Sequence, residues 1–161
     1  MAALPARKPA RQLPIMEDFF DLHPRQSANT LDRTDNVIVS LADKRMHGFL
    51  QSRLGANAVE SMLIVFCNES GDYLIDEQVG WGDISTVELD LPCLLRRALI
   101  IGASSFLMVH NHPSGNCWPS DNDIYATRRV AKAADLVGLH VIDHLVVTHC
   151  QCYSMRAGAI V

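Results

Sequence analysis

The chain has 161 residues, of which 48% are hydrophobic and 20% charged, and its formal net charge at pH 7 is −4. This length and composition suit one compact domain with a hydrophobic core. The net negative charge excludes the chain as a whole as an electrostatic partner of nucleic acid. We therefore expect at most weak DNA binding, through the local basic cluster of Arg7, Lys8 and Arg11.

The sequence also bears on the compartment. A membrane-spanning helix needs about 18 or more consecutive apolar residues, and the chain has no such run. The N-terminus carries Arg, Lys and Pro where a signal peptide needs an apolar core. The five cysteines include no C-x-x-C pair, which indicates neither a disulfide framework nor a four-cysteine zinc site. We expect a cytoplasmic protein with reduced thiols and no membrane contact.

Residues 1–36 differ in composition from the rest of the chain. They hold four of the seven prolines and show little apolar periodicity, which is typical of extended or weakly helical segments. From Val37 to Leu54 the apolar residues recur at helical spacing, and Gly55 ends the run. We expect a flexible or weakly structured N-terminal arm over residues 1–36 and one folded domain over residues 37–161.

Strands and helices are predicted to alternate through the second half of the domain. Short apolar runs bounded by turn residues predict strands, and apolar residues at helical spacing predict helices. The expected strands are Glu60 to Asn68, Tyr73 to Val79, Ile84 to Leu91, Phe106 to His112, Leu139 to Thr148 and a short last one around Tyr153. The expected helices are Asp35 to Gly55, Pro92 to Ile101 and Ser120 to Leu136. This order predicts an α/β or α+β fold with one mixed sheet.

The helix near Pro92 has clear end signals. Proline fits a first helical turn, Asp90 precedes it as a candidate N-cap, and Gly102 follows its end. Its expected apolar face consists of Leu94, Leu95, Ala98, Leu99 and Ile101.

The stretch from Phe106 to Asp123 carries the candidate chemistry. In a strand that ends at Pro113, His110 and His112 point to one side and Asn111 to the other. Ser120 is a candidate helix N-cap, and a tight turn can bring Asp123 back towards the histidines. Two imidazoles and a carboxylate leave a fourth tetrahedral position open for water, which is the arrangement of catalytic zinc sites.

Each part of this pattern has a plainer interpretation. A single strand-end histidine is usually structural, and Ser-x-x-Asp alone is more often a capping box. Cys117 lies in the loop before Asp123 and is either a bystander or a replacement metal ligand. Glu60, at the head of an apolar strand, is either a solvated strand-end carboxylate or the base that a zinc hydrolase needs. The conjunction of these groups favours the functional interpretation.

A resemblance to a known family adds to this interpretation. Glu60 followed by HNHPSGNCWPSDND resembles the JAMM signature. Together with the following helix and IDHLVV, it is similar to the RadC family of bacterial JAB/MPN proteins over residues 37–161. The resemblance implies a cytidine-deaminase-like α/β/α sandwich and a catalytic zinc. By position it implies zinc ligands at His110, His112 and Asp123, an acid/base at Glu60 and an oxyanion donor at Ser120.

The chain departs from that family in two respects. A helix-hairpin-helix region usually precedes the domain, whereas only the proline-interrupted arm precedes it here, so no DNA-binding module is inferred. Asn116 and Cys117 stand where the family often has an acidic residue and a proline, which affects the expected loop and not the expected ligands. We interpret Asp143 and His144 as structural, since adjacent strand residues face opposite ways and at most one can face the site.

The expected activity is zinc-dependent hydrolysis of a peptide or isopeptide amide, with a peptide or ubiquitin-like protein as substrate. The alternative is a non-enzymatic, DNA-metabolism-associated module that retains the metal fold. Three other chemistries are rejected. The HNH string lacks the longer spacing of the nuclease motif, an iron(II) facial triad favours an all-β barrel, and a base deaminase needs H-x-E and P-C-x-x-C.

Overall fold

The computed structural model describes residues 44–81 and 89–161. In chain order, the elements are α2 (Lys44–Leu50), the π-helical turn η1 (Gln51–Gly55), β1 (Ser61–Cys67), β2 (Tyr73–Trp81), α3 (Leu91–Ile100), β3 (Ser105–Asn111), α4 (Asp121–Asp135), β4 (His140–Val147), β5 (Cys152–Ser154) and β6 (Ala159–Ile160). The expected arm, its basic cluster and the expected helix before Lys44 lie outside the described residues.

One mixed sheet organises the described chain. The strand order is β2-β1-β3-β4-β5-β6, and β1 runs antiparallel to both β2 and β3. The pair β3 and β4 is parallel, and α4 makes the crossover between them. The later pairs are antiparallel. This arrangement confirms the predicted α/β class with one mixed sheet.

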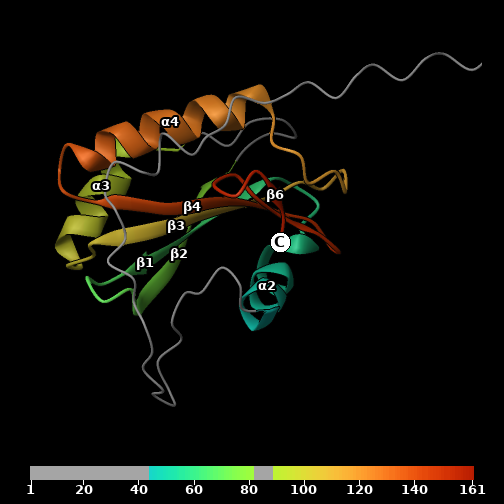
Figure 1. Ribbon diagram of the computed structural model, residues 1–161, viewed down its shortest axis with the longest axis horizontal. Helices are drawn as coiled ribbons and strands as arrows, with labels where there is room; N and C mark the ends of the chain where they lie inside the picture. Colours follow the sequence, from blue (N-terminus) through green and yellow to red (C-terminus); the bar gives the residue numbers. More distant parts are fainter. Residues whose placement is uncertain (1–43, 82–88) are drawn as a thin grey trace, which may run out of the picture.

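Helices cover both faces of the sheet, with α3 and α4 on one side and α2 on the other (Figure 1). Because successive side chains of a strand point to opposite faces of the sheet, β1 and β3 contribute residues to two separate hydrophobic cores. The core beneath α3 and α4 includes Ile64, Phe66, Phe106, Met108, Leu94, Ala98, Val130 and Ala134. The core beneath α2 and η1 includes Leu63, Val65, Leu107, Val109, Met46, Leu50 and Leu54. The central strand β3 is therefore buried on both faces. This burial holds the residues at the end of the strand in place.

Local sequence signals mark the starts of α3 and α4 and the turn between β1 and β2. The Asp90 side chain accepts from the Cys93 amide at the start of α3, as its N-cap position predicted. Ser120 caps α4 in a reciprocal capping box with Asp123. In the β1–β2 turn, Gly71 has a φ of 82°, and the Asn68 side chain accepts from the Asp72 amide.

Three expectations about the elements differ from the structure. Leu91 begins α3 instead of ending a strand, and residues 84–88 of that expected strand lie outside the described residues. Leu99 is 53% exposed, because the buried stripe of α3 is narrower than its periodicity suggests and consists of Leu94 and Ala98. The chain adds β6 after the strand around Tyr153; two residues are too few to produce a periodic signal.

Among the described residues, no helix combines the length and the apolar character that crossing a membrane requires.

Gly55 allows η1 to approach the end of β4. A Cβ there would lie 2.9 Å from the backbone oxygen of Thr148, whereas a Cβ at Gly48 in α2 would meet nothing within 4 Å. Gly55→Ala should therefore lower the free energy of unfolding by about 1–3 kcal/mol, measured by urea denaturation. Gly48→Ala should raise it by up to about 1 kcal/mol, because alanine favours a helix. Equal effects of the two substitutions would contradict this tight approach.

Candidate metal centre

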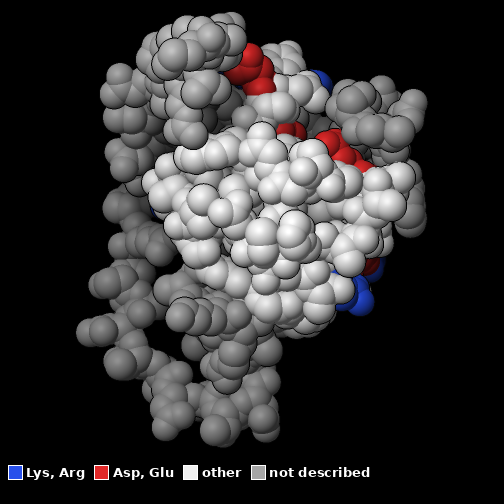
Figure 2. Space-filling model, turned by 90° about the vertical axis from the view of Figure 1, so that its right-hand side faces the viewer, with Lys and Arg blue, Asp and Glu red and all other residues white. Residues whose placement is uncertain are grey.

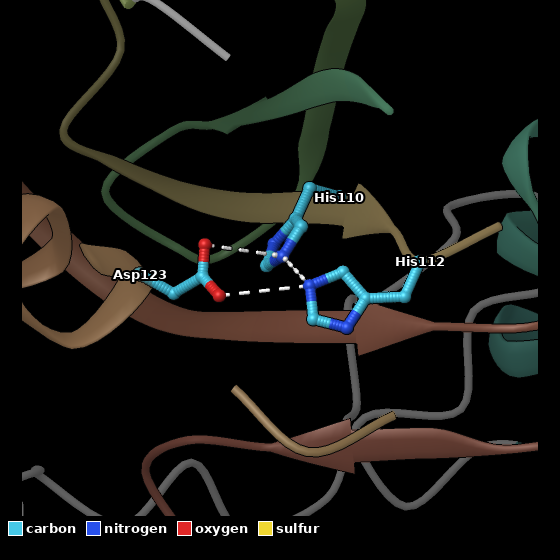
Figure 3. Close-up of side chains that lie close together, drawn as sticks. All are labelled: His110, His112 and Asp123. Carbon is cyan, nitrogen blue, oxygen red and sulfur yellow. Dashed lines mark hydrogen bonds and ion pairs between the residues drawn. The ribbon is translucent and has the colours of Figure 1, made fainter. Parts of the chain in front are cut away.

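Three side chains that can bind a metal converge at the end of β3. His110 lies on the α3 and α4 face of the strand, His112 follows just beyond the strand end, and Asp123 comes from the first turn of α4 (Figure 3). The two Nε2 atoms are 2.9 Å apart. Asp123 Oδ1 lies 3.3 Å from Nε2 of His110, and Oδ2 lies 3.5 Å from Nε2 of His112. The structure thus brings together the three residues expected to be ligands, in a group that could hold a metal ion.

Backbone and capping interactions hold this geometry in place. The loop after β3 turns back at once, with the Gly115 amide donating to the His112 carbonyl and Gly115 at a φ of 79°. The Asp123 Oδ2 atom accepts from the Ser120 amide at 2.7 Å and from the Ser120 hydroxyl at 2.6 Å. The capping box that starts α4 therefore also aims the Asp123 carboxylate at the histidines.

The converging atoms are hydrogen-bond acceptors. His112 Nδ1 lies 2.7 Å from the carbonyl oxygen of Asn116, which can only accept, so Nδ1 carries the ring proton and a neutral ring offers a lone pair at Nε2. Burial by itself raises the pKa of Asp123, but the hydrogen bonds that protonated His110 and His112 rings donate to it outweigh burial and hold that pKa well below its ordinary value. The Asp123 bond in turn raises the pKa of His112. The site therefore attracts a positive charge, as a proton or a metal.

Of Asp143 and His144, which were both interpreted as structural, His144 is the one whose side chain contacts a candidate ligand. Its Nε2 lies 2.8 Å from Nδ1 of His110, on the side of that ring away from Asp123. Burial is the larger cause, and the neighbouring His110 the next, of a pKa of His144 that lies well below its ordinary value. The contact depends on β3 and β4 being paired with Met108 opposite His144. That register pairs two strands that lie far apart in the chain, so the local sequence pattern could not have revealed it.

Asp143, by contrast, acts as a structural residue, as expected. Its carboxylate accepts from the Ser154 hydroxyl and from the amides of Arg156 and His144. These bonds tie β4 to β5 and to the turn that follows. Desolvation raises the pKa of Asp143, and its hydrogen bonds oppose that rise.

A pocket of about 930 Å³ joins the metal-binding group to the other expected site residues. Glu60 and Ser120 both line it, together with the three candidate ligands. Glu60 is half-buried and close enough to His112 to raise the pKa of that ring. Among the described residues, the metal-binding group does not include Cys117, whose thiol is buried and contacts the Gln151 side chain.

Asn111, between the two histidines, holds the segment that carries Glu60. Its Oδ1 accepts from the Ser61 amide at 2.8 Å. Its Nδ2 donates to the carbonyl oxygens of Asn57 and Val59 at 3.2 and 3.1 Å. The side chain is fully buried, so the three bonds fasten residues 57–61 to β3 and set where Glu60 enters the pocket.

Asn111→Asp tests this attachment. The new carboxylate keeps the acceptor for the Ser61 amide but, when ionised, cannot donate to the two carbonyls. The free energy of unfolding should fall by about 1–3 kcal/mol, measured by urea denaturation. Asn116→Asp is the matched control, because the Asn116 side chain accepts from the Trp118 amide and an aspartate preserves that bond. Equal stability of both variants would show that Asn111 does not anchor the segment.

Comparisons with known proteins agree with this geometry. The family model described as "RadC-like JAB domain" matches residues 40–160. A UPF0758 protein of Porphyromonas gingivalis is 38% identical over 88 residues, which cover 55% of this chain and 39% of the relative. UPF0758 proteins of Finegoldia magna and Photorhabdus laumondii are each 36% identical, over 63% and 66% of this chain and 53% and 46% of the relatives.

The chain thus spans about half the length of the curated relatives it matches. The family match covers most of the chain, including both histidines, Asp123 and Glu60. The chain belongs to the family of RadC-like JAB domains.

Proposed function

We propose that this domain is a zinc-dependent hydrolase of the JAMM type that cleaves a peptide or isopeptide amide with water as the nucleophile. The observation that carries the proposal is the convergence of His110, His112 and Asp123 on one point of a pocket that Glu60 and Ser120 also line. Two imidazole nitrogens and one carboxylate oxygen form a donor set used by catalytic zinc sites. The acceptor character of all three groups favours a cation between them.

Zinc bound there would supply a Lewis acid that polarises a carbonyl and lowers the pKa of water. Glu60 is then the residue that moves the proton. Its carboxylate takes a proton from the attacking water and returns it to the departing amine nitrogen. The half-buried position of Glu60 on the pocket wall supports this role. Its carboxylate reaches the pocket but is not one of the three candidate metal ligands.

Ser120 is the proposed donor to the oxygen that gains negative charge during the reaction. In the structure its hydroxyl donates to Asp123 Oδ2 and accepts from the Asp123 amide. A hydroxyl has a single proton to donate, so donation to a substrate oxygen requires it to leave Asp123. Ser120 therefore has two roles, as the N-cap that orients Asp123 and as the oxyanion donor.

The surroundings of the site support a peptide substrate over a nucleic acid. The pocket has an apolar wall that includes Met62, Leu91, Trp118 and Tyr125. Of the Asp, Glu, Lys and Arg side chains that line the pocket, three are acidic (Glu60, Asp90 and Asp123) and one, Arg129, is basic. On the face drawn in Figure 2, the described part is mostly uncharged, with acidic atoms in its upper part and few basic atoms at its margins. A surface that follows phosphates needs clustered Lys and Arg.

The metal site predicts close to one zinc per chain. His110→Ala, His112→Ala and Asp123→Ala should each remove the zinc, because every substitution deletes one of three donors. Cys117→Ser should retain full zinc, since that thiol lies outside the group. Elemental analysis of purified protein measures both results. Full zinc content after two of the three alanine substitutions would show that the ligand set is wrong.

Glu60→Gln distinguishes an enzyme from a metal-binding relic. Glutamine keeps the shape of the side chain but cannot accept a proton at neutral pH. Hydrolysis should fall by roughly 10² to 10⁴, with unchanged zinc content and thermal stability. The rate is measured on a substrate found by screening isopeptide conjugates and peptide libraries against a chelated control. Full activity in this variant would refute the mechanism, and loss of zinc would make Glu60 a ligand.

Ser120→Ala should give a different result. The rate should fall by roughly 10² to 10³ through loss of an oxyanion donor, and stability by about 1 kcal/mol through loss of the N-cap. Activity is measured with the same substrate, and stability by thermal unfolding. A stability loss with no change in rate would reduce Ser120 to a helix cap.

A further inference from the structure

A buried chain of hydrogen bonds runs from the back of His110 into α4 and returns to the residue that supplies the carboxylate. His110 Nδ1 lies 2.8 Å from His144 Nε2, and His144 Nδ1 lies 2.6 Å from the Thr127 hydroxyl. That hydroxyl lies 2.6 Å from the backbone carbonyl oxygen of Asp123. His110, His144 and Thr127 are at most 2% exposed, so water does not compete for these bonds.

The donor and the acceptor in each of these bonds follow from the Asp123 backbone carbonyl, which ends the chain of hydrogen bonds. The Asp123 carbonyl can only accept, so the Thr127 hydroxyl donates its single proton to it. The hydroxyl oxygen is then an acceptor for His144, and Nδ1 of His144 must carry a proton. The Met155 sulfur, 3.6 Å from the hydroxyl, is a weak acceptor and does not compete with a carbonyl at 2.6 Å.

The same reasoning passes through His144 to His110. A neutral imidazole has one donor and one acceptor, so a proton on Nδ1 of His144 leaves its Nε2 as an acceptor. Nδ1 of His110 therefore donates to it and carries the His110 ring proton. Nε2 of His110, which faces His112 and Asp123 (Figure 3), is left with a free lone pair.

We propose that Thr127 and His144 are positioning residues that fix the tautomer of His110, so that its Nε2 is already deprotonated and aimed at the metal position. Asp123 both anchors this chain through its carbonyl and contributes a carboxylate oxygen to the site. The start of α4 thereby positions two of the three candidate metal ligands, Asp123 directly and His110 through the hydrogen-bond chain. This role rests on the proposed metal site. His112 needs no such chain, because the Asn116 carbonyl fixes its tautomer directly.

Thr127→Val tests the chain. Valine keeps the shape of threonine but gives the Nδ1 proton of His144 no acceptor. His144 then gains by moving its proton to Nε2 and donating to His110, which forces the His110 proton onto Nε2, where the metal would bind. Zinc affinity, measured by competition with a chelator on the full chain, should fall about 10- to 100-fold. Thr127→Ser keeps the hydroxyl and should keep near wild-type affinity.

Thr148→Val is the matched control for losing a buried threonine hydroxyl. Thr148 is fully buried, and its hydroxyl accepts from the Gln151 amide at 3.0 Å, away from the metal-binding group. This variant should keep wild-type zinc affinity even where urea denaturation shows a loss of stability. Wild-type affinity in Thr127→Val, or an equal loss of affinity in Thr148→Val, would overturn the proposal.

A second readout does not depend on zinc. Nitrogen-15 NMR of the metal-free full chain reports which ring nitrogen carries the proton. Protons on Nδ1 of both His110 and His144 in the wild type, with a shift to Nε2 in Thr127→Val, are expected. A neutral His110 ring that carries its only proton on Nε2 in the wild type would overturn the proposal. Wild-type protein that binds no zinc but shows the expected tautomers would refute the proposed hydrolase and leave the tautomer assignment standing.

Discussion

The candidate site depends above all on three groups that the fold holds close together and that, with both imidazole rings neutral, are all hydrogen-bond acceptors towards one another. Nε2 of His110, Nε2 of His112 and the Asp123 carboxylate converge at distances of 2.9 to 3.5 Å. Lone pairs at this separation repel unless a proton or a metal lies among them. The fold maintains this arrangement because β3 is buried on both faces and the capping box fixes the start of α4.

Side chains alternate between the two faces of β3 and its end, so the consecutive residues 110–112 act on both sides of the sheet. His110 and His112 face the pocket, while Asn111 on the opposite face fastens the segment that carries Glu60. A slip of one residue in the pairing of β3 would exchange these faces. The antiparallel register of β1 with β3 therefore positions the candidate ligands and the candidate base together.

Local signals predicted much of the fold and of the site. Three of these signals each lie within a few residues of sequence: the apolar run of β3, the i, i+2 spacing that puts His110 and His112 on one side, and the Ser120 capping box. The structure places them as expected. Non-local features were missed. The contact of His144 with His110 depends on the register of two strands joined by a helix. The exposure of Leu99 depends on how wide a stripe of α3 the sheet covers. The proposed role of Ser120 as an oxyanion donor came from resemblance alone.

X-ray absorption at the zinc edge of the purified chain tests the central claim most directly, because it identifies the atoms around the metal. The account predicts only nitrogen and oxygen neighbours, at about 2.0–2.2 Å, with the signature of two imidazoles. A sulfur neighbour at about 2.3 Å would contradict it, since Cys117 would then bind the metal in place of one of the three converging groups.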